Sequence, residues 1–546
     1  MPAPNAQQEI QQIPLAIVGG TKFGRYPKIS VEQSWNFIVS DNWLVPYAGY
    51  KNVLSIASGT SGRGIYSSYR ESMLIAVYGS FVYRINPTGT YQQDGTPNFT
   101  FGLIGQLYTS SGDVYIAENN GGQITITDGS YVYVYNYVTQ TADLIFTSSN
   151  PISPNFFSFP FENPGYVSFQ NGAMIIACDN STNWVLSAAN QATVWTNAAA
   201  FVGSLETKPD YVQAAVPVPG GGNNLLVLGR NVAELWQFTG AALFPYQRNS
   251  TFNSDYGCIN AATVASLGDV IVWIGVNEQT GPILMVYKGN QIQQISTDGI
   301  DFEMGNLSNP QDCTGFLYQQ DGHLIYQFTF PLDNISYAYD FETNLFFNVS
   351  DEDLNYHIAR QVVYFNNTYY FVSLNGGNLY EFDTKFSSAQ YASDDIRDIP
   401  RIRITPPFRL PTQRYFIVKS LGFTIENGEP NPTVDIPLYA VPLINIAAED
   451  GTLIAAENGN LVSAEVEFID NSDSIVLATN VVYLSISRDG GENFGSSLAR
   501  PMNQTGVRKS RFIYQRLGQA NDFTAQLRFV GKSRFVVTDG QLEVYQ

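Results

Sequence analysis

Histidine and cysteine are both scarce in this sequence of 546 residues. The two histidines, His323 and His357, are too few for a site with several imidazole ligands and make a histidine-based triad a poor candidate. The three cysteines, Cys178, Cys258 and Cys313, are odd in number and far apart, unlike a disulfide framework or a zinc motif. We therefore expect structural or surface histidines, buried thiols, and no catalytic, cofactor-binding or metal-binding residue.

Long apolar runs are also missing. No stretch approaches the roughly 18 apolar residues of a membrane-spanning helix. Residues 1–6 have no cationic segment followed by an apolar one, so we expect neither a signal peptide nor membrane insertion. Helical periodicity is confined to short pieces such as Leu443–Glu449.

Positive charge is the third shortage, with 28 Lys and Arg against 48 Asp and Glu. The imbalance lies in residues 1–400, which carry 14 Lys and Arg against 33 Asp and Glu, whereas residues 401–546 carry 14 against 15. Proteins that grip nucleic acid neutralise phosphates with Lys and Arg. An acidic surface would instead let DNA pass without sequence-specific binding.

The chain is rich in aromatic and β-branched segments that repeat around glycine turns. Met73–Tyr78, Gly79-Ser80 and Phe81–Ile85 form one hairpin pattern, and Gln123–Thr127, Asp128-Gly129 and Tyr131–Tyr135 repeat it about fifty residues later. Seven such turns occur, near Gly79, Gly129, Gly172, Gly229, Gly289, Gly322 and Gly376. This spacing predicts an all-β fold with a β-propeller of about seven blades. Six or eight blades are possible, because the first 60 residues could complete the last blade.

Composition changes after the repeats. The acidic stretch Ser393–Asp398 leads into Pro400 and Pro406-Pro407, where we place a domain boundary. We predict an N-terminal arm and leading strands over 1–48, the propeller over 49–388, and a β-sandwich-like C-terminal domain over 389–546. An arm of this kind either docks on a neighbour or closes its own domain, and the second reading is favoured.

The last part of the C-terminal domain carries a cluster of cations. Residues 488–534 hold nine Lys and Arg against three Asp and Glu. One reading is a solvated strand face, and the other is a docking face for an acidic neighbour, such as the propeller of the next subunit. The candidate interface residues are Arg508, Lys509, Arg511, Arg516 and Arg528.

Ser487–Phe494 fits the Asp-box pattern of sialidase-like propellers. In such a turn Asp489 caps backbone amides, Gly490 and Gly491 adopt unusual backbone angles, and Phe494 anchors the turn in the core. The box is structural even in enzymes. It nevertheless motivates an alternative function, a carbohydrate-binding or glycoside-cleaving propeller. That alternative needs arginines and acids at the propeller mouth, and its main arginine candidates are dispersed: Arg63, Arg70, Arg84, Arg230 and Arg360.

Several stretches together resemble one protein family. They are Gly62–Tyr66 with Tyr83–Ile85, Leu225–Gly240, Gly257–Gly275, His323–Asp340, Val482–Gly495, Tyr514–Gly518 and Leu527–Phe529. Their order resembles that of the packaged-DNA stabilisation proteins of short-tailed, Salmonella-type bacteriophages, also called tail hub or plug proteins. The resemblance does not cover the insertion around 431–480.

The resemblance implies a structural virion protein of the phage tail, made in the bacterial cytoplasm. It implies a hexameric homo-oligomer ring below the portal and its adaptor protein, retention of packaged DNA until genome ejection, and docking surfaces for a tail needle or plug and for tailspikes or fibres. The shortage of catalytic residues favours the same reading, in which the protein is not an enzyme.

Overall fold

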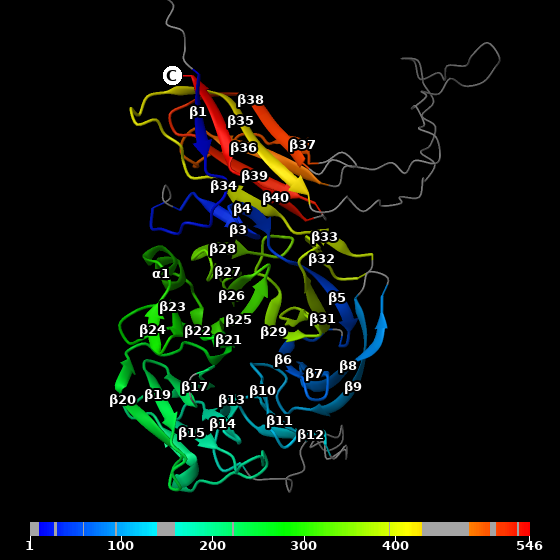
Figure 1. Cartoon of the computed structure of the whole chain (residues 1–546), viewed down its shortest axis with the longest axis vertical. Helices are drawn as coiled ribbons and strands as arrows, with labels where there is room; N and C mark the ends of the chain where they lie inside the picture. The colour runs from blue at the N-terminus through cyan, green and yellow to red at the C-terminus, as the bar shows by residue number, and fades with distance from the viewer. Residues whose placement is uncertain are drawn as a thin grey trace, which may run out of the picture.

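The computed structural model describes residues 10–26, 30–57, 59–92, 96–138, 159–220, 223–392, 394–427, 480–502, 509–531 and 534–545. Within them nearly all regular structure is β, and the one α-helix is α1 (Asp298–Gly305). The predicted short helix Leu443–Glu449 and most of the insertion around 431–480 lie outside the described residues. A propeller forms one end of the molecule and a sandwich the other, as Figure 1 shows.

Seven sheets make the propeller, and their first strands face one another around a central axis. Blade one contains β6 (Gly62–Ser68), β7 (Met73–Tyr78), β8 (Phe81–Tyr91) and β9 (Pro97–Gln106), and blade two contains β10 (Tyr115–Glu118), β11 (Gln123–Thr127) and β12 (Val132–Asn136). Blade three contains β13 (Pro164–Gln170), β14 (Ala173–Cys178), β15 (Asn183–Leu186) and β16 (Val202–Ser204). Blade four contains β17 (Val212–Pro217), β18 (Asn224–Gly229), β19 (Ala233–Phe238) and β20 (Tyr246–Ser254).

Blade five contains β21 (Ala265–Leu267), β22 (Val270–Gly275), β23 (Ile283–Lys288) and β24 (Gln291–Gln294). Blade six contains β25 (Thr314–Gln320), β26 (His323–Phe330), β27 (Ile335–Asp340) and β28 (Leu345–Val349). Blade seven contains β29 (Ala359–Phe365), β30 (Thr368–Ser373), β31 (Asn378–Asp383) and β5 (Gly49–Ser55). Strand β5 pairs antiparallel with β31, so a segment from the first 60 residues completes the last blade, as the sequence suggested. This closure joins the beginning and end of the repeat region.

The sandwich has two sheets. One contains β1 (Ile10–Leu15), β41 (Gly540–Tyr545), β35 (Phe416–Asn427), β40 (Phe535–Val537), β4 (Trp43–Pro46) and β3 (Phe37–Ser40), with β38 (Lys509–Ala520) paired to β35. The other contains β2 (Gln33–Trp35), β34 (Arg401–Ile404), β39 (Thr524–Val530), β36 (Val481–Ser487) and β37 (Leu498–Pro501). Strands β1–β4 therefore pair within this chain, the reading that the sequence favoured for the arm.

The second sandwich sheet continues directly into the propeller. Strand β2 pairs parallel with β28 at Trp35 and Asn348, and antiparallel with β34, so blade six and the sandwich share one nine-stranded sheet. Buried Asn36 reinforces the junction, since its side chain donates to Ser350 Oγ and to the Pro400 carbonyl, both at 2.8 Å. The two domains are thus linked by backbone pairing as well as by chain connection.

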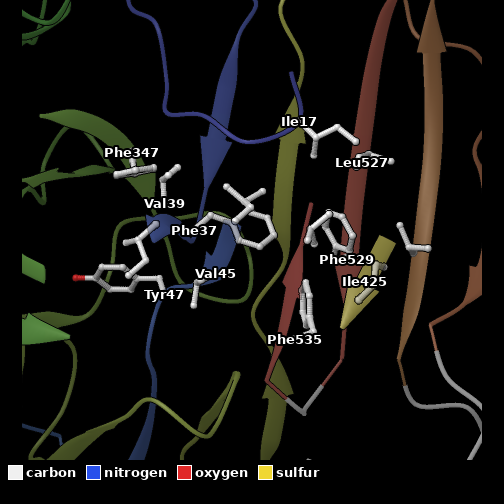
Figure 2. Close-up of a cluster of buried hydrophobic side chains, with 14 of the residues drawn as sticks. Ile17, Phe37, Val39, Val45, Tyr47, Phe347, Ile425, Leu527, Phe529 and Phe535 are labelled. Atoms are coloured by element: carbon white, nitrogen blue, oxygen red, sulfur yellow. The ribbon is translucent and has the colours of Figure 1, made fainter. Parts of the chain in front are cut away.

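One apolar cluster crosses the same junction. Figure 2 shows Phe347 and Tyr47 on the propeller side, Phe37 between the two parts, and Phe529 and Phe535 inside the sandwich. Phe37 meets the rings of Phe529 and Phe535 edge to face, with centroids 5.6 and 6.1 Å apart. A continuous core across the junction resists relative motion of the domains.

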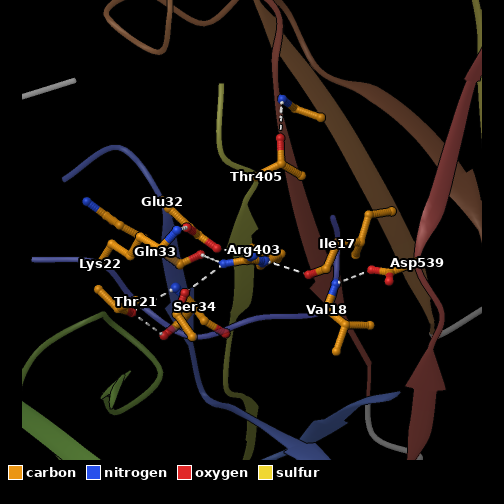
Figure 3. Close-up of polar contacts among 12 residues, drawn as sticks. Ile17, Val18, Thr21, Lys22, Glu32, Gln33, Ser34, Arg403, Thr405 and Asp539 are labelled. Atoms are coloured by element: carbon orange, nitrogen blue, oxygen red, sulfur yellow. Dashed lines mark hydrogen bonds and ion pairs between the residues drawn. The ribbon is translucent and has the colours of Figure 1, made fainter. Parts of the chain in front are cut away.

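A buried arginine fastens the N-terminal segment to the sandwich (Figure 3). Arg403 on β34 is fully buried, and it donates to the carbonyls of Ile17 at 2.6 Å and Gly20 at 2.9 Å and to Glu32 Oε1 at 2.7 Å. Lys22 Nζ lies 3.0 Å from the other oxygen of Glu32. Buried charges persist when they are paired and hydrogen-bonded, and this guanidinium meets both conditions.

Candidate functional site

A shallow groove of about 370 Å³ crosses the outer face of the first sandwich sheet. It lies over adjacent strands β38, β35, β41 and β1. Gly422 is one of its lining residues, and a Cβ there would meet no atom closer than 3.7 Å, so a side chain at this position would clash with nothing. Arg511 and Arg516 of β38 and Lys419 of β35 line the groove, opposed by the carboxylate of Glu543.

The charges in this groove do not cancel. Glu543 Oε2 lies 3.2 Å from Lys419 Nζ and accepts a hydrogen bond from Ser420 Oγ at 3.0 Å. Hydrogen bonds from Lys419 and Ser420 lower the pKa of the Glu543 carboxyl, so it stays ionised. Arg511 and Arg516 are exposed, and neither has an ion-pair partner among the described residues. The groove therefore presents two uncompensated guanidinium groups.

The other cations predicted as a docking face are not all gathered here. Arg508 and Lys532 lie outside the described residues. Lys509, at one end of β38, pairs with Glu426 at 2.6 Å. Arg528 is exposed but belongs to β39 in the second sheet, so the structure separates it from the groove.

Two more cations of residues 488–534 make contacts within the protein. Arg534 Nη2 lies 2.6 Å from Asp321 Oδ2, an ion pair between the sandwich and blade six. The Arg500 guanidinium stacks over the Tyr514 ring, 4.7 Å from its centroid. The charge count of the sequence thus overstates the free cationic surface, because part of it is already paired.

The Asp-box segment forms a tight turn after β36. Asp489 Oδ1 accepts hydrogen bonds from Ser487 Oγ at 2.5 Å and from the backbone amides of Glu492 and Asn493, each at 3.1 Å. The Ser487 hydroxyl and then Asn493 hold the pKa of Asp489 well below its usual range. Gly490 and Gly491 have φ of +87° and +96°, values that favour glycine.

Phe494 was expected to anchor this turn in the core, but it is only half-buried. Hydrogen bonds to Asp489, not aromatic burial, hold the turn in place. The half-buried carboxylate of Asp489 accepts four hydrogen bonds, all from Ser487, Glu492 and Asn493 of the turn itself. The Asp box is therefore a structural element in this chain.

Two arginines in the propeller's central channel are held by hydrogen bonds and an ion pair within the protein. A cavity of about 200 Å³ lies among the first strands of the blades and contains Arg63, Asp113 and Arg360. Buried Arg63 donates to the carbonyls of Gly79, Thr109, Gly112 and Ser111, while Arg360 pairs with Asp113.

The remaining arginine candidates lie elsewhere. Arg70 donates to the Asn120 carbonyl, Arg84 to Asn86, and Arg230 to Asn180. The structure does not bring the five arginines into one catalytic constellation. This agrees with their dispersal in the sequence.

The histidines and cysteines are part of the core. His323 Nδ1 lies 2.9 Å from Asp340 Oδ2, and His357 sits among aromatic rings where burial lowers its pKa to about 3. All three cysteines are buried and free, and burial raises the pKa of Cys178 and Cys258 to about 12. The described part of the chain contains no cluster of His, Cys, Asp or Glu able to hold a metal ion, and none of its helices could span a bilayer.

Two family models match the chain. The model described as bacteriophage P22 Gp10, beta-propeller, matches residues 25–387, and the model described as bacteriophage P22 Gp10, beta-sandwich, matches residues 450–545. The two matches follow the order of the propeller and the sandwich in the structure. No curated protein matches the chain significantly.

Solved structures give only distant likenesses. The WD40 β-propeller domain of Doa1 is 12% identical, with a TM-score of 0.37, over 62% of this chain and 97% of that one. The AfRom2 CNH domain is 8% identical, with a TM-score of 0.36, over 61% and 99%. The designed protein Ika8 is 9% identical, with a TM-score of 0.34, over 68% and 100%.

Proposed function

The chain belongs to the bacteriophage P22 Gp10 family and is a structural protein of a P22-type phage tail, and we propose that its copies form a closed ring below the portal and adaptor. The observation that carries the structural role is the match of the two family models, over residues 25–387 and 450–545. The proposed ring is a hexamer that retains packaged DNA and receives a tail needle or plug and tailspikes or fibres.

Charge segregation supports a head-to-tail contact in this ring. The groove offers Arg511 and Arg516, which have no ion-pair partner in the part of the chain that the structure describes, while residues 1–400 carry 14 Lys and Arg against 33 Asp and Glu. Heterologous contacts between unlike surfaces generate closed rings when the rotation closes. We propose that the groove docks on an acidic surface of the neighbouring copy, with Lys509 at one end of β38 beside it. Arg528, on the second sheet, would contact the partner only outside the groove, and the Asp489 turn would support β36 without contacting the partner.

The acidic character of the propeller also suits a conduit for DNA. A wall rich in carboxylates repels the phosphates of DNA. No ion pairs between protein and phosphate would then have to break during ejection. We propose that DNA passes the ring without sequence-specific binding. The domain division that goes with this proposal is a propeller over 49–388 and a sandwich over 389–546, to which residues 1–48 add strands β1–β4. Strands β32 (Ser388–Gln390) and β33 (Ile396–Asp398), around the start of the second range, extend blade seven by pairing with β5 and with each other.

Two experiments test the proposal. Phage particles produced without this protein should fill with DNA and then lose it, and DNA-filled heads that stay intact without the protein would refute a role in retention.

The second experiment replaces Arg511 and Arg516 with Glu and measures incorporation into tails by quantitative protein gel or mass spectrometry. We expect a loss of at least about tenfold, since two like-charge contacts cost more than 1.4 kcal/mol. Arg414→Glu is the matched control, because Arg414 is exposed on the sandwich but does not line the groove. Equal incorporation of the double variant and the control would refute the docking face.

A further inference from the structure

Two β-bulges lie side by side in the sheet that carries the groove. The register of β38 with β35 shifts between Val418 and Ser420, where Arg516 and Leu517 together oppose the single residue Lys419. The register of β35 with β41 shifts at the same place, so Lys419 is itself an extra residue relative to β41. An extra residue interrupts the alternation of a strand and re-aims the side chains beside it. Lys419 and Arg516, one on each bulged strand, both line the groove.

The bulge in β38 decides which face of the sheet Arg516 occupies. Arg511 and Arg516 are separated by an odd number of positions, so a regular strand would point them to opposite faces. Phe512 and Tyr514 are buried, and Arg516 would continue their alternate series into the core. Instead Gln515 and Arg516 are exposed neighbours, and both line the groove together with Arg511. The extra residue thus moves Arg516 from the core face to the groove face.

Arg516 keeps this position in a backbone conformation that is unfavourable for arginine. Its φ is +60°, and among the described residues it is the only one other than glycine with a positive φ inside a strand. In one common class of bulge, the first bulged residue is a glycine with positive φ. Most other residues with positive φ in the described chain are Asn or Asp outside the strands, and these types tolerate the region. Strain of this kind gathers at binding sites.

The neighbours of Arg516 in the chain hold the bulge in place. Leu517 is buried, and its carbonyl accepts a hydrogen bond from Arg488 Nη2 at 2.9 Å. Gly518 has a φ of +90°, and a Cβ there would lie 2.9 Å from the same guanidinium nitrogen. The backbone around Arg516 is therefore fixed by contacts on the inner side of the sheet. Its own side chain has no ion-pair partner among the described residues and remains available on the outer side.

The charges of the groove define what can bind there. Lys419, Arg511 and Arg516 face the single carboxylate of Glu543, so the lining residues have an excess of two positive charges. Two carboxylates would neutralise this excess. Figure 1 shows β1, β35 and β38 at the end of the sandwich away from the propeller of the same chain. The groove is therefore open to another copy.

We propose that the bulge in β38 is the recognition element of the groove, and that it holds Arg516 under backbone strain so that Arg516 and Arg511 each bind one carboxylate of the neighbouring copy. A guanidinium can bind a carboxylate through two parallel hydrogen bonds, so the spacing of the two arginines selects the spacing of the two acids. The inference rests on the proposed function in taking the neighbouring copy as the partner. It adds that the chain keeps Arg516 for docking at a cost to its own stability.

Melting temperatures of the isolated protein test the strain. Arg516→Gly and Arg516→Ala both remove the guanidinium, but only glycine relieves the positive φ, so Arg516→Gly should melt about 1–2 °C above Arg516→Ala. Gln515→Gly and Gln515→Ala are the matched control pair. Gln515 is exposed in the same strand without a positive φ, so there the glycine variant should melt below the alanine variant. The same order of melting in both pairs overturns the proposal.

Incorporation into tails, measured by mass spectrometry of purified particles, tests the docking role. Arg516→Gly should be incorporated about tenfold less than wild type although its backbone is relaxed, because a charge-assisted contact is lost. Arg516→Lys, which keeps the charge but not the planar fork, should fall between the two. Arg414→Ala, at an exposed arginine of the sandwich outside the groove, should be incorporated like wild type.

The possible failures are distinguishable. Wild-type incorporation of Arg516→Gly, alongside loss of the variant with Glu at both 511 and 516, overturns this inference and leaves the docking face standing. Equal losses in Arg516→Gly and Arg414→Ala also overturn the inference. Absence of the wild-type protein from tails overturns the proposed function instead.

Discussion

Replacing Arg403 with Leu should loosen the N-terminal segment from the rest of the molecule. The side chain is fully buried and donates to three carbonyls of the segment, at Ile17, Gly20 and Gln33, and to the carboxylate of Glu32. Leu fills part of the volume but supplies no donor. The variant therefore leaves the Glu32 carboxylate and three carbonyls without the hydrogen bonds that Arg403 donates, in a place that water does not reach easily.

The expected cost follows from that burial. Removing one member of a buried ion pair costs roughly 3–5 kcal/mol, because the remaining charge is uncompensated. Lys22 still lies 3.0 Å from Glu32 and is largely exposed, so it compensates part of the charge and favours the lower end, about 3 kcal/mol. Lys509→Met, which breaks an exposed pair with Glu426, should cost between about 0 and 1 kcal/mol.

Urea unfolding followed by tryptophan fluorescence measures both variants. Trp35 and Trp43 lie in β2 and β4, so they report on the segment that Arg403 fastens. Adding Glu32→Gln to Arg403→Leu should recover part of the loss, because no charge is then left buried. A free energy of unfolding for Arg403→Leu within 1 kcal/mol of wild type, or no recovery in the double variant, would refute the reasoning.

Three further predictions concern single residues. Burial lowers the pKa of His357 from its ordinary 6.5 to about 3, so on acidification this histidine binds a proton in the unfolded chain before it does so in the folded one. The free energy of unfolding should therefore fall as the pH falls below 6.5. In urea titrations the wild type should lose about 2 kcal/mol more of that free energy between pH 7 and pH 5 than His357→Asn does. Asp489→Ala should lower the urea midpoint of the sandwich, and Asp489→Asn, which keeps an acceptor, should lower it less. Gly129→Ala, at φ +81° in open space, should cost about 1 kcal/mol in thermal unfolding, whereas Gly376→Ala, also in open space but without positive φ, should be neutral or stabilising.

The repeat period predicted the number of blades but not the position of the turns within them. Each of the seven glycine turns falls in a different blade sheet. Gly79 lies between the second and third strands of its blade, Gly172 between the first and second, and Gly289 between the third and fourth. A glycine turn suits any antiparallel hairpin, so local sequence cannot say which hairpin of a blade it belongs to.

Long-range pairing explains what the sequence left open in the candidate site. From the sequence, the cations of residues 488–534 were predicted to form one surface. In the structure, however, Arg534 forms an ion pair with Asp321, more than 200 residues away in sequence. The strands of residues 10–46 were readable as β, but their partners near residues 400 and 540 were not. Helix α1 was not predicted, because its eight residues include two glycines and carry little helical pattern.

Imaging of the intact phage particle at side-chain resolution is the most direct test of the tail-hub assignment. It should show a closed ring of propeller-plus-sandwich subunits between the portal adaptor and the distal tail, with Arg511 and Arg516 against an acidic surface of the neighbouring copy. A particle whose head–tail junction contains no density for this fold would contradict the account.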